Sequence, residues 1–388
     1  MIYILVLLFL LYNTYIYDIR QSKRNREAML NWILVVLVAL SGCSFCVGAD
    51  IPGYMDDYDF YTVKDIIDFE NGNPIGWKAF NVFCKSISED FAFLKITNAI
   101  LVNYTVVRFV KKNSSSPFGT ILLYFIIIFP LLSFNILKQS MAFVILLIAF
   151  EYIKSNLKVY YVLILLAISF HQSAVVLLLI PLFGYIRFSK RILYVGLIVG
   201  FVLLVVSNYH VDTLLNIFYL FSDENDMITG GAKMSKYLNY TKFEVTSMNI
   251  LGIIESMLFF SLTIWVSKIY YIQAPNKSSL ICMLSVLCGT LVLLNNSIPV
   301  VFYRLMQYFY IFQIIVYSDV LFGMFRRKKS SPILAIVIMI AYCYIPIKTY
   351  FSINPTTGIP LYYQYTPYYS VFDKQYSPVR VSYFGKHE

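Results

Sequence analysis

A few side chains that could do chemistry lie inside or at the edges of long apolar stretches: Asp50, Lys138, His171, Glu255 and Arg304. Ionisable groups in such surroundings are costly, and they commonly have a function. Arg304 has a permanently charged, planar guanidinium group that can donate two hydrogen bonds to phosphate oxygens. Lys138, with Gln139 beside it, could face the same anion. His171 has a neutral imidazole that can take a proton from a hydroxyl.

Each of these groups also has a purely structural interpretation. Arg304 could pair with Glu255 or extend outward to the membrane surface. Lys138 could be an anchor at the interface, and His171 could be a satisfied structural residue. The sequence leaves both interpretations open.

An acidic and aromatic stretch begins at Gly48-Ala49-Asp50 and continues through Tyr54, Asp56, Asp57 and Asp59. Its carboxylates could orient sugar hydroxyls, with Tyr54 and Tyr303 as aromatic partners, and Asp50 could serve as a base. The alternative is a solvated acidic loop, which is less favoured for Asp50 because that residue lies closest to the apolar stretch.

The composition of the chain dictates what must position these groups. Hydrophobic residues make up 59% and charged residues 13%, whereas soluble domains have about 25% charged residues. So few charges cannot cover a water-soluble surface, which excludes ordinary soluble enzymes and disordered or fibrous chains. An all-α, polytopic membrane protein remains, forming a single membrane domain over residues 1–388.

One helical span needs about 20 apolar residues. The chain accommodates about 10 candidate spans, at 1–17, 29–47, 91–110, 118–137, 139–153, 192–209, 248–270, 279–296, 299–322 and 331–349. Long segments between or after them are predicted as outer loops, 48–90 and 210–247, and as a Tyr-rich outer tail, 350–388.

Charge distribution sets the predicted orientation. Of the 31 basic residues 18 fall in clusters on one side of the spans, and 16 of the 21 acids fall on the other side. Basic residues close to spans stay in the cytoplasm. The net charge of +10 therefore indicates topology rather than a nucleic-acid surface.

The segment 159–185 is flanked by basic clusters at both ends and is too short for two full spans. Its middle reads Ser169-Phe170-His171-Gln172-Ser173, a polar interruption. We expect a short hairpin with His171 near its tip, because irregular backbone at membrane depth needs protein or water around it. One long tilted helix is the alternative.

Other motifs are lacking. The six cysteines have no zinc or haem spacing, although Cys46 and Cys84 could pair on the outer side. There is no Walker A or Gly-x-Gly-x-x-Gly sequence. We therefore expect neither a metal nor a cofactor. The tail tyrosines, from Tyr362 to Tyr369, suit an interfacial belt or a cap better than a sugar-stacking platform.

Together these elements resemble the EpsG family, relatives of the Wzy-type polymerases of exopolysaccharide and O-antigen synthesis. The resemblance rests on short motifs in order: Gly48-Ala49-Asp50 with Tyr54, Asn135-x-x-Lys138-Gln139, Phe170-His171-x-Ser173-Ala174, Tyr303-Arg304 and Pro367-Tyr368. Two arginines typical of the family are replaced, one by Phe45-Cys46 and the other by Lys138.

The resemblance implies a bacterial cytoplasmic (inner) membrane enzyme that joins oligosaccharide repeat units carried on undecaprenyl pyrophosphate, on the outer face. Arg304, Lys138 and Gln139 would bind the pyrophosphate. His171 or Asp50 would be the base, and Asp56, Asp57, Tyr54 and Tyr303 would bind sugar. Other assembly proteins, such as a flippase or a chain-length regulator, would be partners.

Three other functions stay open. A glycosyltransferase that uses polyprenyl-phosphate sugars could employ Asp56 and Asp57, and it would add single residues. An O-antigen ligase would transfer the glycan to a different acceptor. A flippase or transporter would move lipid-linked units without changing glycan length, although such proteins often have two related halves, which this sequence lacks.

Overall fold

The computed structural model describes residues 1–68, 73–185, 198, 250–273, 279–295, 299–327, 331–353 and 358–375. The predicted span 192–209, the predicted outer loop 210–247 and residues 376–388 of the tail lie outside the described residues. All regular elements in the described part are helices, and extended pairing there is limited to isolated bridges. The predicted all-α class is therefore confirmed.

Five helices are long and apolar enough to cross a membrane: Ile2–Ile19, Phe91–Asn113, Leu251–Gln273, Phe302–Arg326 and Pro332–Phe351. Shorter apolar helices of 10–17 residues accompany them. These helices confirm a multi-pass membrane protein. The chain groups into two compact units, one within Met1–Asp68, Asn73–Leu178 and Leu321–Glu388, the other within Leu179–Val320.

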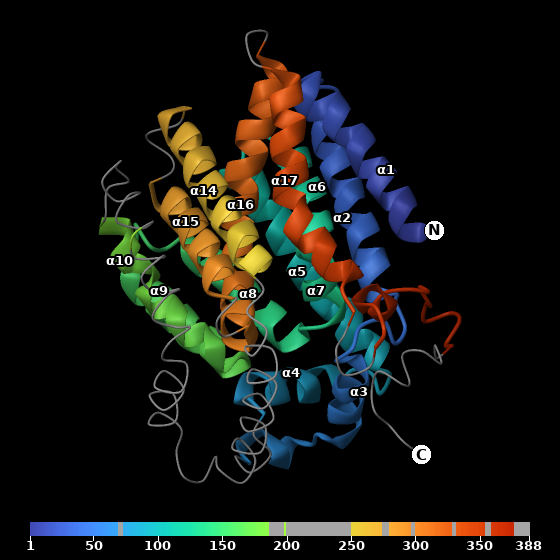
Figure 1. Ribbon diagram of the computed structural model, residues 1–388. Helices are drawn as coiled ribbons and strands as arrows, with labels where there is room; N and C mark the ends of the chain where they lie inside the picture. Colours follow the sequence, from blue (N-terminus) through green and yellow to red (C-terminus); the bar gives the residue numbers. More distant parts are fainter. Residues whose placement is uncertain are drawn as a thin grey trace. The chain divides into compact units, whose positions relative to one another are not determined.

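Long helices of the first unit follow its predicted spans: α1 (Ile2–Thr14), α2 (Arg26–Gly42), α5 (Phe91–Asn113) and α17 (Pro332–Phe351). A short π-helix, η1 (Tyr15–Ile19), continues α1. Leu10 of α1 and Leu37 of α2 are fully buried, whereas Leu5 and Val35 on the same helices are exposed. Apolar side chains on both faces are expected where one face packs and the other meets lipid. α1 packs against α6 and α2 (Figure 1).

The predicted span 118–137 is not one helix but two, α6 (Pro117–Ile127) and α7 (Phe129–Phe134). The helix breaks at Ile128 because Pro130 has no N–H to donate to the preceding turn. A second break at Asn135 and Ile136 precedes α8 (Leu137–Phe150). Asn135 therefore lies in irregular backbone between two helices.

The predicted outer loop 48–90 is largely helical. It contains α3 (Ile51–Phe60), the 3-10 helix η2 (Val63–Ile67) and α4 (Ile75–Lys85). Its apolar side chains bury one another in a cluster that also includes residues of α5 and α8, namely Ile51, Tyr54, Tyr58, Tyr61, Trp77, Cys84, Leu94 and Leu137. We call α3, η2 and α4 the outer cap.

The segment 159–185 forms α9 (Leu157–Phe170), the 3-10 helix η3 (Gln172–Leu179) and α10 (Ile180–Tyr185). The Tyr160 hydroxyl, near the start of α9, donates to the carbonyl oxygen of Leu177. Since α9 rises roughly 15 Å between Tyr160 and Phe170, this bond requires the chain to turn back after Phe170. The described structure thus contains the reversal that the polar interruption predicts.

The second unit contains α14 (Ile250–Gln273), α15 (Ser279–Leu294) and most of α16 (Pro299–Arg326). Polar side chains join these helices in their buried core. Gln313 donates to the Thr263 hydroxyl at 3.1 Å, and that hydroxyl lies 3.0 Å from the Tyr317 hydroxyl. Hydrogen bonds between helices contribute to helix association in lipid, where the hydrophobic effect does not drive it.

One group of ion pairs in the first unit joins the start of α2 and the ends of η1, α5 and α8. Arg26 pairs with the buried Asp18 at 3.3 Å, Lys111 pairs with Glu27, and Lys112 pairs with Glu151 at 2.9 Å. All of them come from segments that the charge distribution predicts to be cytoplasmic. The tail 358–375 (red in Figure 1) instead contacts the other end of α2, where Val371 N–H donates to Cys43 O at 2.8 Å.

Candidate active site

The turn before α3 can be made only by glycine at position 48. Gly48 has φ +109°, a value that L side chains rarely adopt, and an added Cβ would lie 1.6 Å from the carbonyl oxygen of Phe134. The turn thereby contacts the end of α7 directly. It leads to Asp50, whose side chain is exposed at the N-cap of α3.

Asn135 joins two motifs that are far apart in the sequence. Its side-chain oxygen accepts the Ala49 N–H at 2.8 Å. Its amide nitrogen donates to Gln364 Oε1 at 3.0 Å and to the Tyr365 hydroxyl at 2.8 Å. The Gly-x-Asp turn, the Asn-x-x-Lys-Gln segment and the tail therefore meet at one buried amide.

Lys138 extends from the first turn of α8 into the outer cap. Its Nζ lies 3.0 Å from Asp57 Oδ2 and donates to Asn73 Oδ1 at 2.6 Å. The ammonium also lies 5.3 Å from the ring centre of Tyr54 and 5.7 Å from that of Trp77, within cation–π range. The side chains of Lys138 and Asp57 are 18% and 21% exposed, so water still reaches the pair.

Asp57 is the most heavily bonded carboxylate of this region. It accepts from the Tyr61 hydroxyl and Asn73 Nδ2, both at 3.3 Å, and from Trp77 Nε1 at 3.4 Å, besides Lys138. Burial, and secondarily the charge of Asp57, raises the pKa of Tyr61 well above its usual value. Tyr61 is therefore a hydrogen-bond donor and not a base here.

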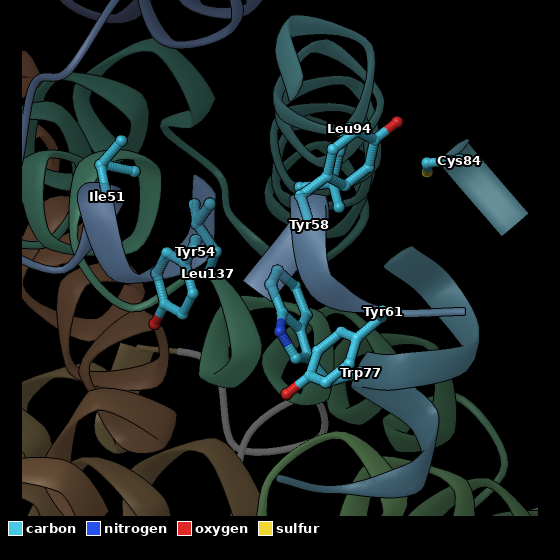
Figure 2. Packing of buried hydrophobic residues seen from close by; sticks show 8 residues of the cluster. All are labelled: Ile51, Tyr54, Tyr58, Tyr61, Trp77, Cys84, Leu94 and Leu137. Atoms are coloured by element: carbon cyan, nitrogen blue, oxygen red, sulfur yellow. The ribbon is translucent and has the colours of Figure 1, made fainter. Parts of the chain in front are cut away.

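Figure 2 shows the indole of Trp77 between Tyr54 and Tyr61, with Leu137 on the Tyr54 side. The Trp77 side chain is fully buried and Tyr54 is 8% exposed. The ring centres of Tyr54 and Trp77 lie 5.2 Å apart, and both rings lie within cation–π range of Lys138.

Sequence reasoning missed Tyr61, Asn73 and Trp77, all of which bond to Asp57. One signal was present, since Trp77 is one of three tryptophans in the chain and lies beside Lys78 in a predicted outer loop. The sequence predicted only an outer loop over residues 48–90, which gave no reason to bring Asn73 and Trp77 back to Asp57.

His171 lies at the reversal between α9 and η3 with extended backbone. Its Nδ1 is 2.6 Å from the Ser173 hydroxyl, so the Phe-His-x-Ser motif fixes the ring by an internal hydrogen bond. α4 packs closely on this tip, because a Cβ added at Gly76 would lie 2.5 Å from Ser169 Oγ. Gly76 of α4 thus lies close to Ser169, two residues before His171, and the next residue, Trp77, lies within cation–π range of Lys138.

The remaining predicted residues differ in exposure. Gln139 is buried at 2% exposure, and Asp56 is exposed on α3. Cys46 and Cys84 are both buried thiols, and no disulfide joins them. Burial raises the pKa of the Cys84 thiol to about 11.

Arg304 and Tyr303 belong to the second unit, on the first turns of α16. The Arg304 side chain is exposed and that of Tyr303 is half-buried. One helical turn further along, Gln307 donates to the carbonyl oxygen of Tyr303 at 3.1 Å.

The structure therefore brings together Tyr54, Asp57 and Lys138 in direct contact, and it links the Gly48–Asp50 turn to Asn135. These residues and His171 all belong to the first unit. The arrangement offers a cation held between a carboxylate and two rings, an exposed carboxylate at a helix N-terminus and an oriented imidazole.

The family model of the EpsG family matches residues 27–370. No curated protein matches the chain, and no solved structure matches it either. The family match extends from the start of α2 to the tail and includes every motif described above. The chain therefore belongs to the EpsG family.

Proposed function

We propose that this protein polymerises lipid-linked oligosaccharide repeat units on the outer face of the bacterial cytoplasmic membrane. The observation that carries the proposal is the EpsG family match over residues 27–370, which points to a Wzy-like polysaccharide polymerase. The multi-pass membrane helices suit a substrate whose carrier stays in the bilayer.

The proposed reaction transfers the growing glycan from undecaprenyl pyrophosphate to a hydroxyl of the next lipid-linked unit. The bond between the reducing-end sugar carbon and the pyrophosphate oxygen breaks, and a glycosidic bond forms to the acceptor oxygen. The hydroxyl proton goes to a base, and undecaprenyl pyrophosphate leaves with the bonding electrons. No nucleotide is consumed, because the pyrophosphate linkage already stores the energy.

The leaving group gains negative charge, so fixed cations should stabilise it as the bond breaks. Arg304 and Lys138 are the proposed cations, and Gln139 is a proposed neighbouring donor. Lys138 is held by Asp57 and Asn73, which limits the motion of its ammonium. A cation fixed in advance costs little reorganisation during the reaction.

His171 is the proposed base, with Asp50 as the second candidate. For this role the ring must carry its proton on Nδ1 and donate it to the Ser173 hydroxyl, and Nε2 must accept the proton of the acceptor hydroxyl. Asp56, Asp57, Tyr54 and Tyr303 are proposed to contact sugar. Of the two aspartates, Asp56 has the exposed side chain.

The direct test incubates the purified protein in detergent with an undecaprenyl-pyrophosphate-linked repeat unit and separates the products by length. We expect a ladder whose steps equal one repeat unit, and its loss in His171→Ala and Arg304→Ala. Addition of single sugars would indicate a polyprenyl-phosphate-sugar transferase. Transfer only to a lipid A core would indicate a ligase, and movement across vesicles without lengthening would indicate a flippase.

A further inference from the structure

The segment from Cys43 to Ala49 has irregular backbone and cannot satisfy its own polar groups. Such groups need partners when buried, and here distant segments supply them. The Lys95 ammonium donates to Ser44 O at 3.0 Å, and the Phe45 N–H donates to Tyr369 O at 2.8 Å. The conformation of this turn therefore depends on hydrogen bonds from other segments of the chain.

The C-terminal segment supplies most of these partners. Gly48 N–H donates to Gln364 O at 2.9 Å, and Val371 N–H donates to Cys43 O at 2.8 Å. The Tyr368 hydroxyl donates to Leu40 O at 3.0 Å, at the end of α2. Residues 361–371 thus follow the turn along its length, from α2 to the residue before Ala49.

The same segment reaches the start of α8 through Asn135. Gln364 and Tyr365 accept both hydrogens of the Asn135 amide, while the amide oxygen holds the Ala49 N–H. Asn135 is 8% exposed, so these bonds are sheltered from water. Asp50 follows this contact by one residue, and Lys138 lies three residues after Asn135.

We propose that residues 361–371 act as a positioning strap, which fixes the Gly48–Asp50 turn and the start of α8 through Asn135. This inference rests on the proposed function, because the groups being positioned are Asp50 and Lys138. A displacement of about 1 Å at a reacting group can reduce the rate roughly a hundredfold. Asn135, Gln364 and Tyr365 are thus positioning residues and do not themselves react.

Two variants and a matched control test the strap. Asn135→Ala removes all three side-chain bonds. Tyr365→Phe removes one acceptor but keeps the ring, whose centre lies 6.1 Å from that of Phe134 and 5.8 Å from that of Tyr350. The control is Tyr362→Phe, which deletes a hydroxyl from the same segment. Tyr362 stacks on Tyr363 and makes none of the Asn135 bonds.

Hydrogen exchange gives a readout that does not depend on activity. We expect the peptide covering residues 43–50 to exchange faster in Asn135→Ala and Tyr365→Phe, and at the wild-type rate in Tyr362→Phe. Should Asn135→Ala fail to accumulate, Tyr365→Phe carries the comparison. Unchanged exchange in both variants would overturn the strap.

Turnover and KM for the lipid-linked repeat unit give the second readout. We expect turnover to fall about threefold in Tyr365→Phe, as for loss of one ordinary hydrogen bond, and at least about tenfold in Asn135→Ala. The KM should change less, because the strap does not touch substrate. Faster exchange with normal turnover would overturn the positioning role. A wild type that forms no ladder would instead reject the polymerase function, and with it the strap's role in that reaction.

Discussion

Among single residues, Gly48 is required by the backbone conformation of the turn that leads to Asp50. In Gly48→Ala the new Cβ would overlap the Phe134 carbonyl, and φ +109° would itself be strained. We expect the variant to lose at least about 2 kcal/mol of stability. Gly53→Ala is the matched control, because an added Cβ there meets nothing within 4 Å. Thermal unfolding in detergent measures both, and equal midpoints would contradict the model of the turn.

Substitutions of Lys138 and Asp57 can show whether Lys138 stabilises the outer cap, takes part in the reaction, or does both. Lys138→Met keeps an unbranched side chain of similar length but removes the ammonium that lies over Tyr54 and Trp77. We expect polymer formation to fall about a hundredfold, as for loss of one fixed donor at a developing charge. Gel analysis of glycan length at matched protein abundance measures the loss.

The second member of the pair supplies the control. Lys138→Met leaves Asp57 without its nearest cation, which alone could loosen the cap. The double variant Lys138→Met with Asp57→Asn removes both charges, and the new amide oxygen can still accept from Tyr61 and Asn73, which share one carboxylate oxygen of Asp57. We expect the double variant to regain thermal stability but not polymer formation. Recovery of both would mean that Lys138 acts only by holding the cap.

Residue types alone predicted several members of the candidate site, but not the contacts between them. Lys138, Asp57 and Tyr54 were predicted as site residues because of their chemical types, and the structure places them in contact. Their pairing could not be predicted, since 81 positions separate Asp57 from Lys138 and only the helical cap joins them. Asn135 was seen as part of a motif, yet its role in holding Ala49 depends on a tail more than 200 residues away.

At the scale of elements, the start of α5 gives a pH-dependent prediction. Asp90 is the N-cap of α5, where it accepts the Ala92 N–H at 2.9 Å, and it pairs with Lys374 at 3.3 Å. These contacts, the backbone bond first, lower the pKa of Asp90 below its usual value. A carboxyl with a lowered folded-state pKa stabilises the fold above its unfolded pKa, and it loses that contribution as pH falls through the folded value.

We therefore expect Asp90→Ala to cost about 1 kcal/mol at neutral pH, the usual worth of an N-cap. The difference from wild type should shrink as the pH is lowered through the acid range where Asp90 takes up its proton. Glu89→Ala removes the same charge from the neighbouring exposed residue and should leave the unfolding midpoint nearly unchanged. A pH-independent difference for Asp90→Ala would show that the carboxylate charge is not what caps the helix.

Helix positions were well predicted wherever the apolar run was uninterrupted, as in α5 and α17. Hydropathy averages over a window, so it merged α6 and α7 across Pro130 and hid the helices of the outer cap. The reversal at His171 was predictable because polar residues and flanking basic clusters both indicated it. The 3-10 geometry of η3 and the hydrogen bond from Tyr160 to Leu177 could not be predicted, because a pattern of hydropathy does not contain them.

At the scale of the whole molecule, sidedness is the property on which the proposed chemistry depends. Segments predicted in the cytoplasm meet through Arg26 with Asp18 and through Lys112 with Glu151, and the outer cap and the tail belong to the other set of predicted segments. Basic residues near spans stay in the cytoplasm, so the end with these ion pairs should be the cytoplasmic one.

Two cysteine substitutions at exposed positions test this orientation in intact cells. A membrane-impermeant thiol reagent should label Asp59→Cys, on the outer cap, and should leave Lys23→Cys unlabelled until the membrane is opened. Wild type is the background control, because its described cysteines are buried except for the half-buried Cys43. The reverse labelling pattern would place the cap, Lys138 and Asp50 on the cytoplasmic side. Lipid-linked repeat units on the outer face could not reach these residues there. Labelling therefore decides whether these residues can act on the substrate at all.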